Sequence, residues 1–306
     1  TKIWSANNFL TLYNCKLDKK INLSSIKLSI NHWIFSEFLK TQNSVTKSIE
    51  NFRFDEAAKH VYQFVWHSYC DWYLEFLKPI FNSKNKNEIK EAKAFSSFMM
   101  ANILKILHPF IPFFTESLWS SNGYKKIFKD YLITSNWPDY KKLNKFIVFA
   151  VSRFYMCDLI DLISCFRSTK AELKITPKLY CDIFFDEKSG NLKKLVNSNI
   201  SLIKQVGRVN KILKTKIKDK NSLDILVHKE KLSLNFNEDV NLASQKSRIL
   251  QKIDVINKQI SVLNNKLKNK AYVSNAPREI VQNDKNLVKE LTIEDGKLRS
   301  IVSSIN

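Results

Sequence analysis

The stretch that determines the fold runs from Asn51 to Pro79 and reads NFRFDEAAKHVYQFVWHSYCDWYLEFLKP. Asp55 and Glu56 fall in a predicted first helical turn, where a carboxylate interacts favourably with the helix dipole. Pro79 predicts the end of that helix, because a proline disfavours helical geometry at the residue before it. Between these ends, apolar residues recur at steps of three and four, which is the period of one buried helix face. The sequence therefore predicts one long core helix whose buried face is Ala57, Ala58, Val61, Tyr62, Val65, Tyr69, Trp72, Tyr73, Phe76 and Leu77.

Composition limits the class of protein. A chain of 306 residues has room for two or three domains, and its four glycines and six prolines leave little turn chemistry for an all-β fold. The five cysteines are odd in number and lack CxxC spacing, which argues against zinc or a disulfide framework and favours a reducing cytosol. No run of about 18 apolar residues is present, so no membrane span is predicted.

The formal charge of +21 is large and favours a polyanionic partner. An alternative is that a genome poor in G and C inflates the lysine content. The charge is clustered, however: residues 188–220 hold ten Lys or Arg against one acid. This clustering favours a polyanionic binding partner over a bias in genome composition.

The rest of the chain is also mainly helical in pattern. His108-Pro109 predicts a helix end, and Thr115 is expected to cap the next helix. Residues 178–185 and 222–228 alternate like strands, so 178–237 is interpreted as a small α/β linking module with a basic helix. Further helices are predicted at 2–13, 91–107 and 140–170, with a polar connection at 82–90.

A coiled-coil hairpin is predicted from residue 238 onward. Six apolar residues there step by 4, 3, 4, 3 and 4, and a turn at 266–281 places Pro277 at a first helical position. A second stripe then returns, which predicts two antiparallel helices. The first stripe is Ile249, Ile253, Ile256, Ile260, Leu263 and Leu267, and the second is Ile280, Leu287, Leu291, Leu298 and Ile301.

Four segments resemble one family over both ends and most of the middle of the chain. RFDEAAKHVYQFVWHSYCDWYLEFLKP resembles the signature helix of the anticodon-binding domain of valyl-tRNA synthetases. KIWSANNFLTLY (2–13) resembles the opening helix of that domain, LHPFIPFFTESLW (107–119) a second motif, and KLKNKAYVSNAPREIV (266–281) the turn of the terminal coiled coil. The departures are Asn8 for an Arg, Lys170 for an Arg within 166–177, Tyr272 for a Phe and Asn275 for a Lys.

The resemblance implies a mainly α protein that binds tRNA. It implies an anticodon-binding helical bundle at 1–150, a linking module at 151–237 and a tRNA-binding coiled-coil arm at 238–306. In the family the aromatic of the opening helix stacks on an anticodon base, so this role falls on Phe9 with Asn8 beside it. Packing of Phe9 into the bundle is the alternative. The residues expected to contact the tRNA body through phosphates are Arg248, Lys252, Lys258, Lys266, Lys268, Lys270 and Arg278.

No catalytic or metal-binding constellation is found in the sequence. Neither a HIGH-like nor a KMSKS-like motif is present, so ATP and Mg²⁺ are expected to bind a catalytic domain outside this chain. The five histidines are scattered, and Asp71 and Glu75 are interpreted as making local hydrogen bonds or ion pairs. The opening without Met predicts a piece of a longer protein. The expected partners are valine tRNA and the catalytic and editing domains of the parent chain, in a monomeric cytoplasmic protein.

Two other classes stay open. One is a coiled-coil protein-interaction module, which salt-insensitive binding to a protein without RNA binding would favour. The other is a sister synthetase for leucine or isoleucine, which shares the bundle and the LHPF-type motif. The CDWYLE run and the terminal hairpin favour the valine enzyme, because an isoleucine enzyme more often ends in a cysteine-rich zinc module.

Overall fold

The computed structural model describes residues 1–18, 21–140, 147–185, 190–213, 221–227, 230–236, 240, 242–269, 272 and 277–305. The chain forms two compact units, Thr1–Asp161 and Leu162–Asn306. The prediction of a mainly helical fold with a small α/β module is confirmed. The predicted domain boundaries after residues 150 and 237 stay predictions.

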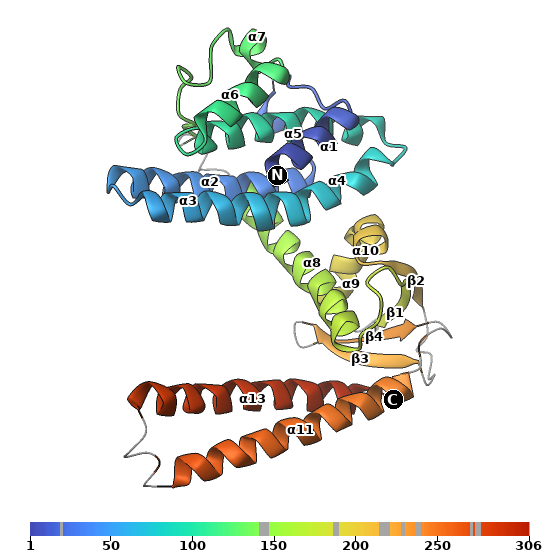
Figure 1. The fold of residues 1–306 in the computed structure, drawn as a ribbon. Coiled ribbons are helices and arrows are strands. Elements are labelled where there is room, and N and C mark those ends of the chain that lie inside the picture. The colour runs from blue at the N-terminus through green and yellow to red at the C-terminus, as the bar shows by residue number, and fades with distance from the viewer. Residues whose placement is uncertain are drawn as a thin grey trace. The chain divides into compact units, whose positions relative to one another are not determined.

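The first unit is a helical bundle (Figure 1). Helices α2 and α3 lie side by side as a helical hairpin, and α5 packs on α2. Helix α5 begins earlier than predicted, because the Asn85 side chain accepts hydrogen bonds from the N–H groups of Asn87 and Glu88 at 3.2 and 3.3 Å. The elements are α1 (Lys2–Leu12), the 3₁₀ helix η1 (Leu23–Ser25), α2 (Ser29–Glu50), α3 (Phe54–Gln63), the π-helix η2 (Phe64–Tyr73), α4 (Leu74–Phe81), α5 (Lys86–Leu107), α6 (Pro112–Ser121) and α7 (Tyr124–Phe128), with α8 (Ile147–Glu172) running on into the second unit.

Aromatic rings from several helices pack against one another in the bundle core. Phe35 is fully buried, and its ring centroid lies 6.1 Å from Phe95 and 5.2 Å from Tyr140. The Tyr73 hydroxyl is also buried and donates to Asn31 at 2.9 Å, which satisfies the polar end of that ring. Edge-to-face and offset contacts of this kind add stability beyond the area that the rings bury.

The signature stretch forms a helix with a ten-residue π segment in its middle. A π-helix has more residues per turn than an α-helix. A 3.6-residue period that fits the buried face on one side of the π segment therefore does not predict the buried face on its other side. Ala58 and Tyr62, predicted to be buried, are exposed, whereas Phe64 and Leu74 are buried.

The expectation that Pro79 ends this helix is wrong. Pro79 lies inside α4, which continues to Phe81. Pro79 and Ile80 are both buried, so packing on the bundle holds the last turn in place despite the missing N–H group.

The prediction that Thr115 caps a helix is also wrong. Helix α6 begins at Pro112, and Thr115 lies within it. Pro112 at the first helical position has no N–H to cap. The Thr115 hydroxyl instead donates to the carbonyl oxygens of Ile111 and Pro112, both at 3.0 Å.

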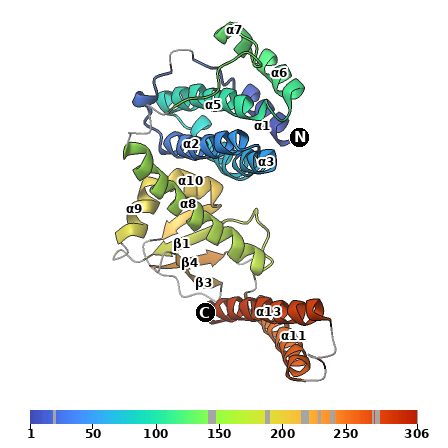
Figure 2. The same ribbon diagram turned by 90° about the vertical axis from the view of Figure 1, so that its left-hand side faces the viewer.

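The second unit contains a four-stranded sheet in the order β2-β1-β4-β3. Figure 2 shows β1, β4 and β3 next to one another. Strands β1 (Cys181–Phe185) and β3 (Ser222–Val227) confirm the two predicted strands, while β2 (Val209–Leu213) and β4 (Glu230–Phe236) were not predicted. Strand β1 pairs parallel to β2 and antiparallel to β4. The predicted basic helix corresponds to two short helices, α9 (Gly190–Ser198) and α10 (Ile200–Val206).

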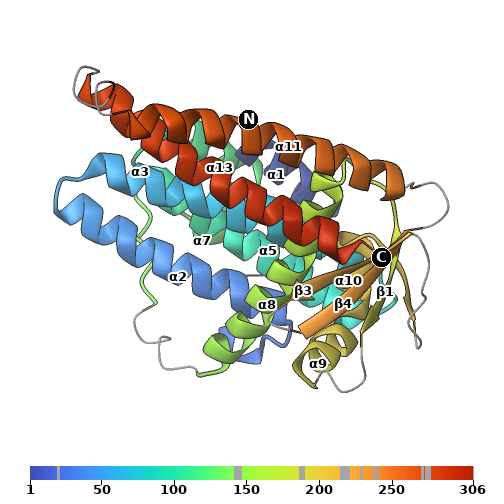
Figure 3. The same cartoon turned by 90° about the horizontal axis from the view of Figure 1, so that it is seen from below.

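The predicted helical hairpin is confirmed by α11 (Leu242–Lys268) and α13 (Arg278–Ser304), which lie side by side (Figure 3). Its root is attached to the sheet: Ile305 bridges Leu223 of β3, and Lys246 Nζ donates to the Ile305 carbonyl at 3.1 Å. The first predicted stripe faces the partner helix, with Ile249, Ile253 and Ile256 buried.

The second predicted stripe is partly wrong. Ile280 and Leu287 are 48% and 43% exposed, whereas Val281 is buried and Val288 is half-buried. The face that pairs with α11 is therefore displaced by one residue over this part of α13. Two adjacent apolar residues at 280 and 281, and again at 287 and 288, make the register ambiguous from the sequence.

Candidate nucleic-acid interface

The opening helix α1 carries the two residues predicted to bind an anticodon. Asn8 is exposed and Phe9 is half-buried. The Phe9 ring centroid lies 4.9 Å from that of Tyr13, which follows α1, and 6.1 Å from that of Phe81 in α4. The half-buried position leaves part of the ring accessible to a base. Its stacking role stays a prediction.

Polar contacts fix α1 on the bundle. Lys2 Nζ lies 2.8 Å from Asp71 Oδ1 and 3.7 Å from the centre of the Trp66 ring. Near the middle of α1, the buried Asn7 accepts a hydrogen bond from Asn122 Nδ2 at 2.6 Å. Since both contacts reach other helices, α1 presents Asn8 and Phe9 in a defined orientation.

The carboxylates of the signature stretch are engaged in ion pairs. Asp71 pairs with Lys2, and Glu75 pairs with Lys78 at 2.5 Å. The interpretation of these two acids as members of local ion pairs is confirmed.

Histidines of the bundle make structural hydrogen bonds. His32 Nε2 lies 2.9 Å from the Ile26 carbonyl, and burial lowers the pKa of His32. His108 Nδ1 lies 2.8 Å from Thr115 Oγ1. Within the described ranges, no three His, Cys, Asp or Glu side chains gather as a metal-binding group. His228 lies outside those ranges.

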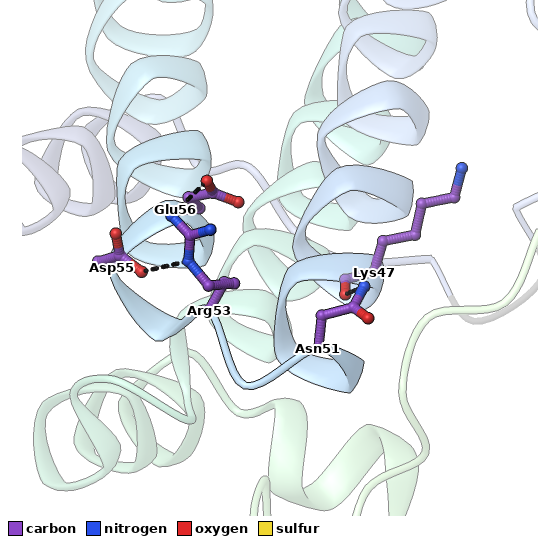
Figure 4. A network of polar contacts seen from close by, with 5 residues as sticks. All are labelled: Lys47, Asn51, Arg53, Asp55 and Glu56. Atoms are coloured by element: carbon purple, nitrogen blue, oxygen red, sulfur yellow. Dashed lines mark hydrogen bonds and ion pairs between the residues drawn. The ribbon is translucent and has the colours of Figure 1, made fainter.

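The turn between α2 and α3 is a surface feature that the sequence analysis did not single out (Figure 4). Arg53 Nε lies 3.4 Å from Asp55 Oδ1, and Arg53 Nη2 lies 2.6 Å from Glu56 Oε1. The hydrogen bond between Arg53 and Asp55 raises the pKa of the guanidinium and lowers the pKa of the carboxyl group. Phe52 lies in this turn between α2 and α3; it is 81% exposed and has φ of 58°. In the sequence, this turn is marked only by NFRF (51–54), whose aromatic residues do not follow the apolar period of the next helix.

The side chains of five of the seven predicted tRNA-body residues lie on described parts of the hairpin. Arg248, Lys252, Lys258, Lys266 and Lys268 are all exposed. Two of them already have partners, because Lys252 Nζ lies 2.5 Å from Glu294 Oε1 and Lys258 Nζ lies 2.7 Å from Asp254 Oδ2. No ion pair of Lys266 or Lys268 with another described residue is found. Lys270 and the side chain of Arg278 lie outside the described residues.

Comparison with known families assigns the bundle. The family model described as the anticodon-binding domain of tRNA ligase matches residues 31–185, just over half of the chain. The chain belongs to this family. A second family model, the valyl tRNA synthetase tRNA binding arm, matches residues 241–306, which contain the α11–α13 hairpin. The resemblance inferred from the sequence is confirmed over residues 31–185 and 241–306.

The chain is also similar to curated proteins named valine–tRNA ligase. It is 35% identical over 284 residues to the valine–tRNA ligase of Pelagibacter ubique, in a match that covers 93% of this chain and 32% of the relative. Valine–tRNA ligases of Agrobacterium fabrum and Bartonella henselae are 29% and 31% identical, over 100% and 97% of this chain and 32% of each relative. The chain spans about a third of the length of the relatives it matches. No helix in the described ranges has the length and apolar character needed to cross a membrane.

Proposed function

We propose that this chain is the tRNA-binding portion of a valine–tRNA ligase and supports the ATP-dependent attachment of valine to its tRNA. The observation that carries the proposal is the presence, in one chain, of an anticodon-binding domain at 31–185 and a valyl-type tRNA binding arm at 241–306. Relatives with the same name match along nearly the whole chain, which supports the choice of valine.

The two ends of the chain bind different parts of the tRNA. In the bundle, Phe9 stacks on an anticodon base and Asn8 hydrogen-bonds beside it, since unstacked loop bases are recognised by aromatic rings and polar side chains. In the hairpin, the exposed bases contact phosphates and sugars, which supplies affinity and orientation with little sequence discrimination.

Valine activation takes place in a catalytic domain outside these 306 residues, which binds ATP and Mg²⁺. That domain and the editing domain of the parent chain are the further partners of this portion. The protein acts as a monomer in the cytoplasm. The chain alone has no activity, so valine-dependent pyrophosphate exchange by the purified chain would contradict this part of the proposal.

Two alternatives are kept for the test. A leucine or isoleucine ligase shares this bundle, and an antiparallel coiled coil can instead dock a protein. The valyl-type arm at 241–306 favours the valine enzyme over both.

The experiment measures binding of the purified chain to a full-length tRNA with a valine anticodon. The control is the same tRNA body with a leucine or isoleucine anticodon. We expect weaker binding of the exchanged tRNA, because only the loop bases differ. Equal affinity for both tRNAs would contradict anticodon recognition, and absence of any tRNA binding would favour the protein-docking alternative.

A further inference from the structure

The turn between α10 and β2 holds an arginine in an unfavourable backbone conformation. Arg208 has φ of 56°, a region that side-chain-bearing residues rarely adopt. A Cβ atom at the preceding Gly207 would lie 2.5 Å from the Ile203 carbonyl oxygen, so this tight turn requires glycine there. The Arg208 carbonyl accepts the backbone N–H of Cys181 at 3.0 Å, which fixes the turn to the start of β1.

Arg208 in turn fixes the exposed ring of Tyr180. Arg208 Nη1 donates to the Tyr180 hydroxyl at 3.0 Å, and the guanidinium carbon lies 5.5 Å from the ring centroid. Tyr180 is 42% exposed and Arg208 is exposed as well. A guanidinium has five N–H donors, so most of them stay open for a second acceptor. The ring is thus oriented before any ligand arrives.

Further positive charge lies close to this pair. Lys170 Nζ is buried and donates to the Leu179 carbonyl at 2.8 Å, one residue before Tyr180. Burial lowers the pKa of Lys170, the nearby Cys181 opposes this shift, and the charges of Arg208 and Arg167 lower it further. These bases are therefore near enough to repel one another, and an anion bound at Arg208 relieves that repulsion.

Among the described residues, no acid forms an ion pair with Arg208. Asp182, two residues after Tyr180, accepts the backbone N–H of Lys211 at 3.0 Å. Glu172, at the end of α8, is exposed, and Lys174 and Lys178 in the same connection are exposed bases. Lys174 also has a positive φ, of 52°. Strained residues of this kind often mark functional sites, and glycine or asparagine would adopt the same backbone at lower cost.

We propose that Tyr180 and Arg208 form an additional RNA contact in the linking module, where an unstacked base of the tRNA stacks on Tyr180 and the adjoining phosphate binds Arg208. The inference rests on the proposed function, because the ligand is the tRNA that the chain binds. An exposed aromatic ring beside a guanidinium is suited to a nucleotide: the ring takes the face of any base, and the planar fork takes phosphate oxygens in pairs.

Matched variants of the full chain test the stacking half of this contact. Tyr180→Leu should weaken binding of full-length valine tRNA about fivefold or more, because the stacking platform is lost. Tyr180→Phe keeps the ring and loses only the hydroxyl that Arg208 binds, so it should lose clearly less affinity than Tyr180→Leu. Tyr155→Leu removes a tyrosine that is 46% exposed elsewhere and should leave the affinity unchanged. An equal loss in Tyr180→Phe and Tyr180→Leu would overturn the stacking contact.

Arg208 variants test the phosphate half. Arg208→Gln should flatten the slope of log affinity against log salt by roughly one unit, as expected for one lost phosphate contact. Arg208→Lys keeps the charge without the planar fork, and should keep most of the slope while losing affinity. An unchanged slope in a folded Arg208→Gln variant would overturn the phosphate contact.

Failure of the inference is distinguishable from failure of the proposed function. If the unaltered chain does not bind tRNA, the proposed function fails. If it binds and the Tyr180→Leu and Arg208→Gln variants bind equally well, only the additional contact fails. Should Tyr180→Leu unfold the module, photo-crosslinking of the unaltered chain to tRNA that carries 4-thiouridine is decisive. A crosslinked peptide that contains Tyr180 supports the contact, and its absence overturns it.

Discussion

The bundle and the hairpin bury their apolar side chains in different ways. In the bundle, large rings such as Phe35, Phe38 and Phe76 are completely buried and contact rings from several helices. In the hairpin, Ile256 is buried, but Ile260, Leu263 and Leu267 farther along α11 are only half-buried. Two helices alone cannot enclose a side chain as a bundle does, so burial decreases toward the turn.

This difference suits two kinds of RNA contact. A rigid core holds the surface rings of the bundle in fixed orientations, which base stacking requires. The hairpin needs only enough buried area to keep two helices paired. The phosphate contacts proposed for its exposed lysines depend on charge, which tolerates motion. We therefore infer that the bundle supplies discrimination between tRNAs and the hairpin supplies general affinity. Four variants test this division of roles.

Phe35→Ala should lower the free energy of unfolding of the bundle by about 3–5 kcal/mol, because a fully buried ring that packs on Phe95 and Tyr140 is replaced by a cavity. Urea unfolding followed by tryptophan fluorescence measures this, since all six tryptophans lie in Thr1–Asp161. Phe113→Ala is the control, as Phe113 is 91% exposed and should change stability by less than about 0.5 kcal/mol. A similar loss in both variants would contradict the assigned core.

Ile256→Ala should lower the free energy of unfolding of the hairpin by about 2 kcal/mol. This is the low end for such a change, because Ile256 packs between only two helices. Faster amide hydrogen exchange in α11 and α13 would report it. Tryptophan fluorescence should show an unchanged bundle. Val255→Ala, at a position that is 52% exposed, is the matched control and should leave exchange unaltered. A shifted tryptophan transition would show that hairpin and bundle do not unfold independently.

Phe9→Ala should weaken binding of a valine-type anticodon stem-loop about tenfold or more, since stacking on an aromatic ring is worth roughly 1–3 kcal/mol per base. Fluorescence anisotropy with a labelled stem-loop measures the affinity. Trp4→Ala is the control, because Trp4 is an aromatic on the same helix and is 51% exposed. If Phe9 only packs against Tyr13 and Phe81, the variant instead loses stability while the folded fraction binds normally.

Replacing Lys266 and Lys268 together by Gln should flatten the salt dependence of tRNA binding by up to about two units, one for each lost phosphate contact. The matched control replaces Lys252 and Lys258, which removes the same charge but takes lysines that pair with Glu294 and Asp254. The control should change the slope less. Binding of the isolated anticodon stem-loop should be unaffected by both double variants. Equal slopes for all three proteins would exclude this end of the hairpin as a phosphate-binding surface.

Features that depend on near neighbours in the chain can be predicted from the amino-acid sequence. The 3.6-residue period predicts the helices of the bundle, because residues three and four apart share a helix face. The steps of 4 and 3 from Ile249 to Leu267 predict α11, and Pro277 predicts the start of the returning helix. The sequence motifs identify the family, since each match extends over a whole helix or turn.

The tertiary structure alone decided the features that depend on distant partners. Strands β2 and β4 were missed because each is stabilised by pairing with β1, from which it is separated by helices or by another strand. The π segment Phe64–Tyr73 changes which rings of the signature helix face the core, and the local period does not reveal that change. Tyr180 and Arg208 are 28 residues apart, and only the parallel pairing of β1 with β2 brings them into contact. A sequence pattern reports the local conformational preference of the backbone, whereas contacts across the sheet are set by packing of the whole chain.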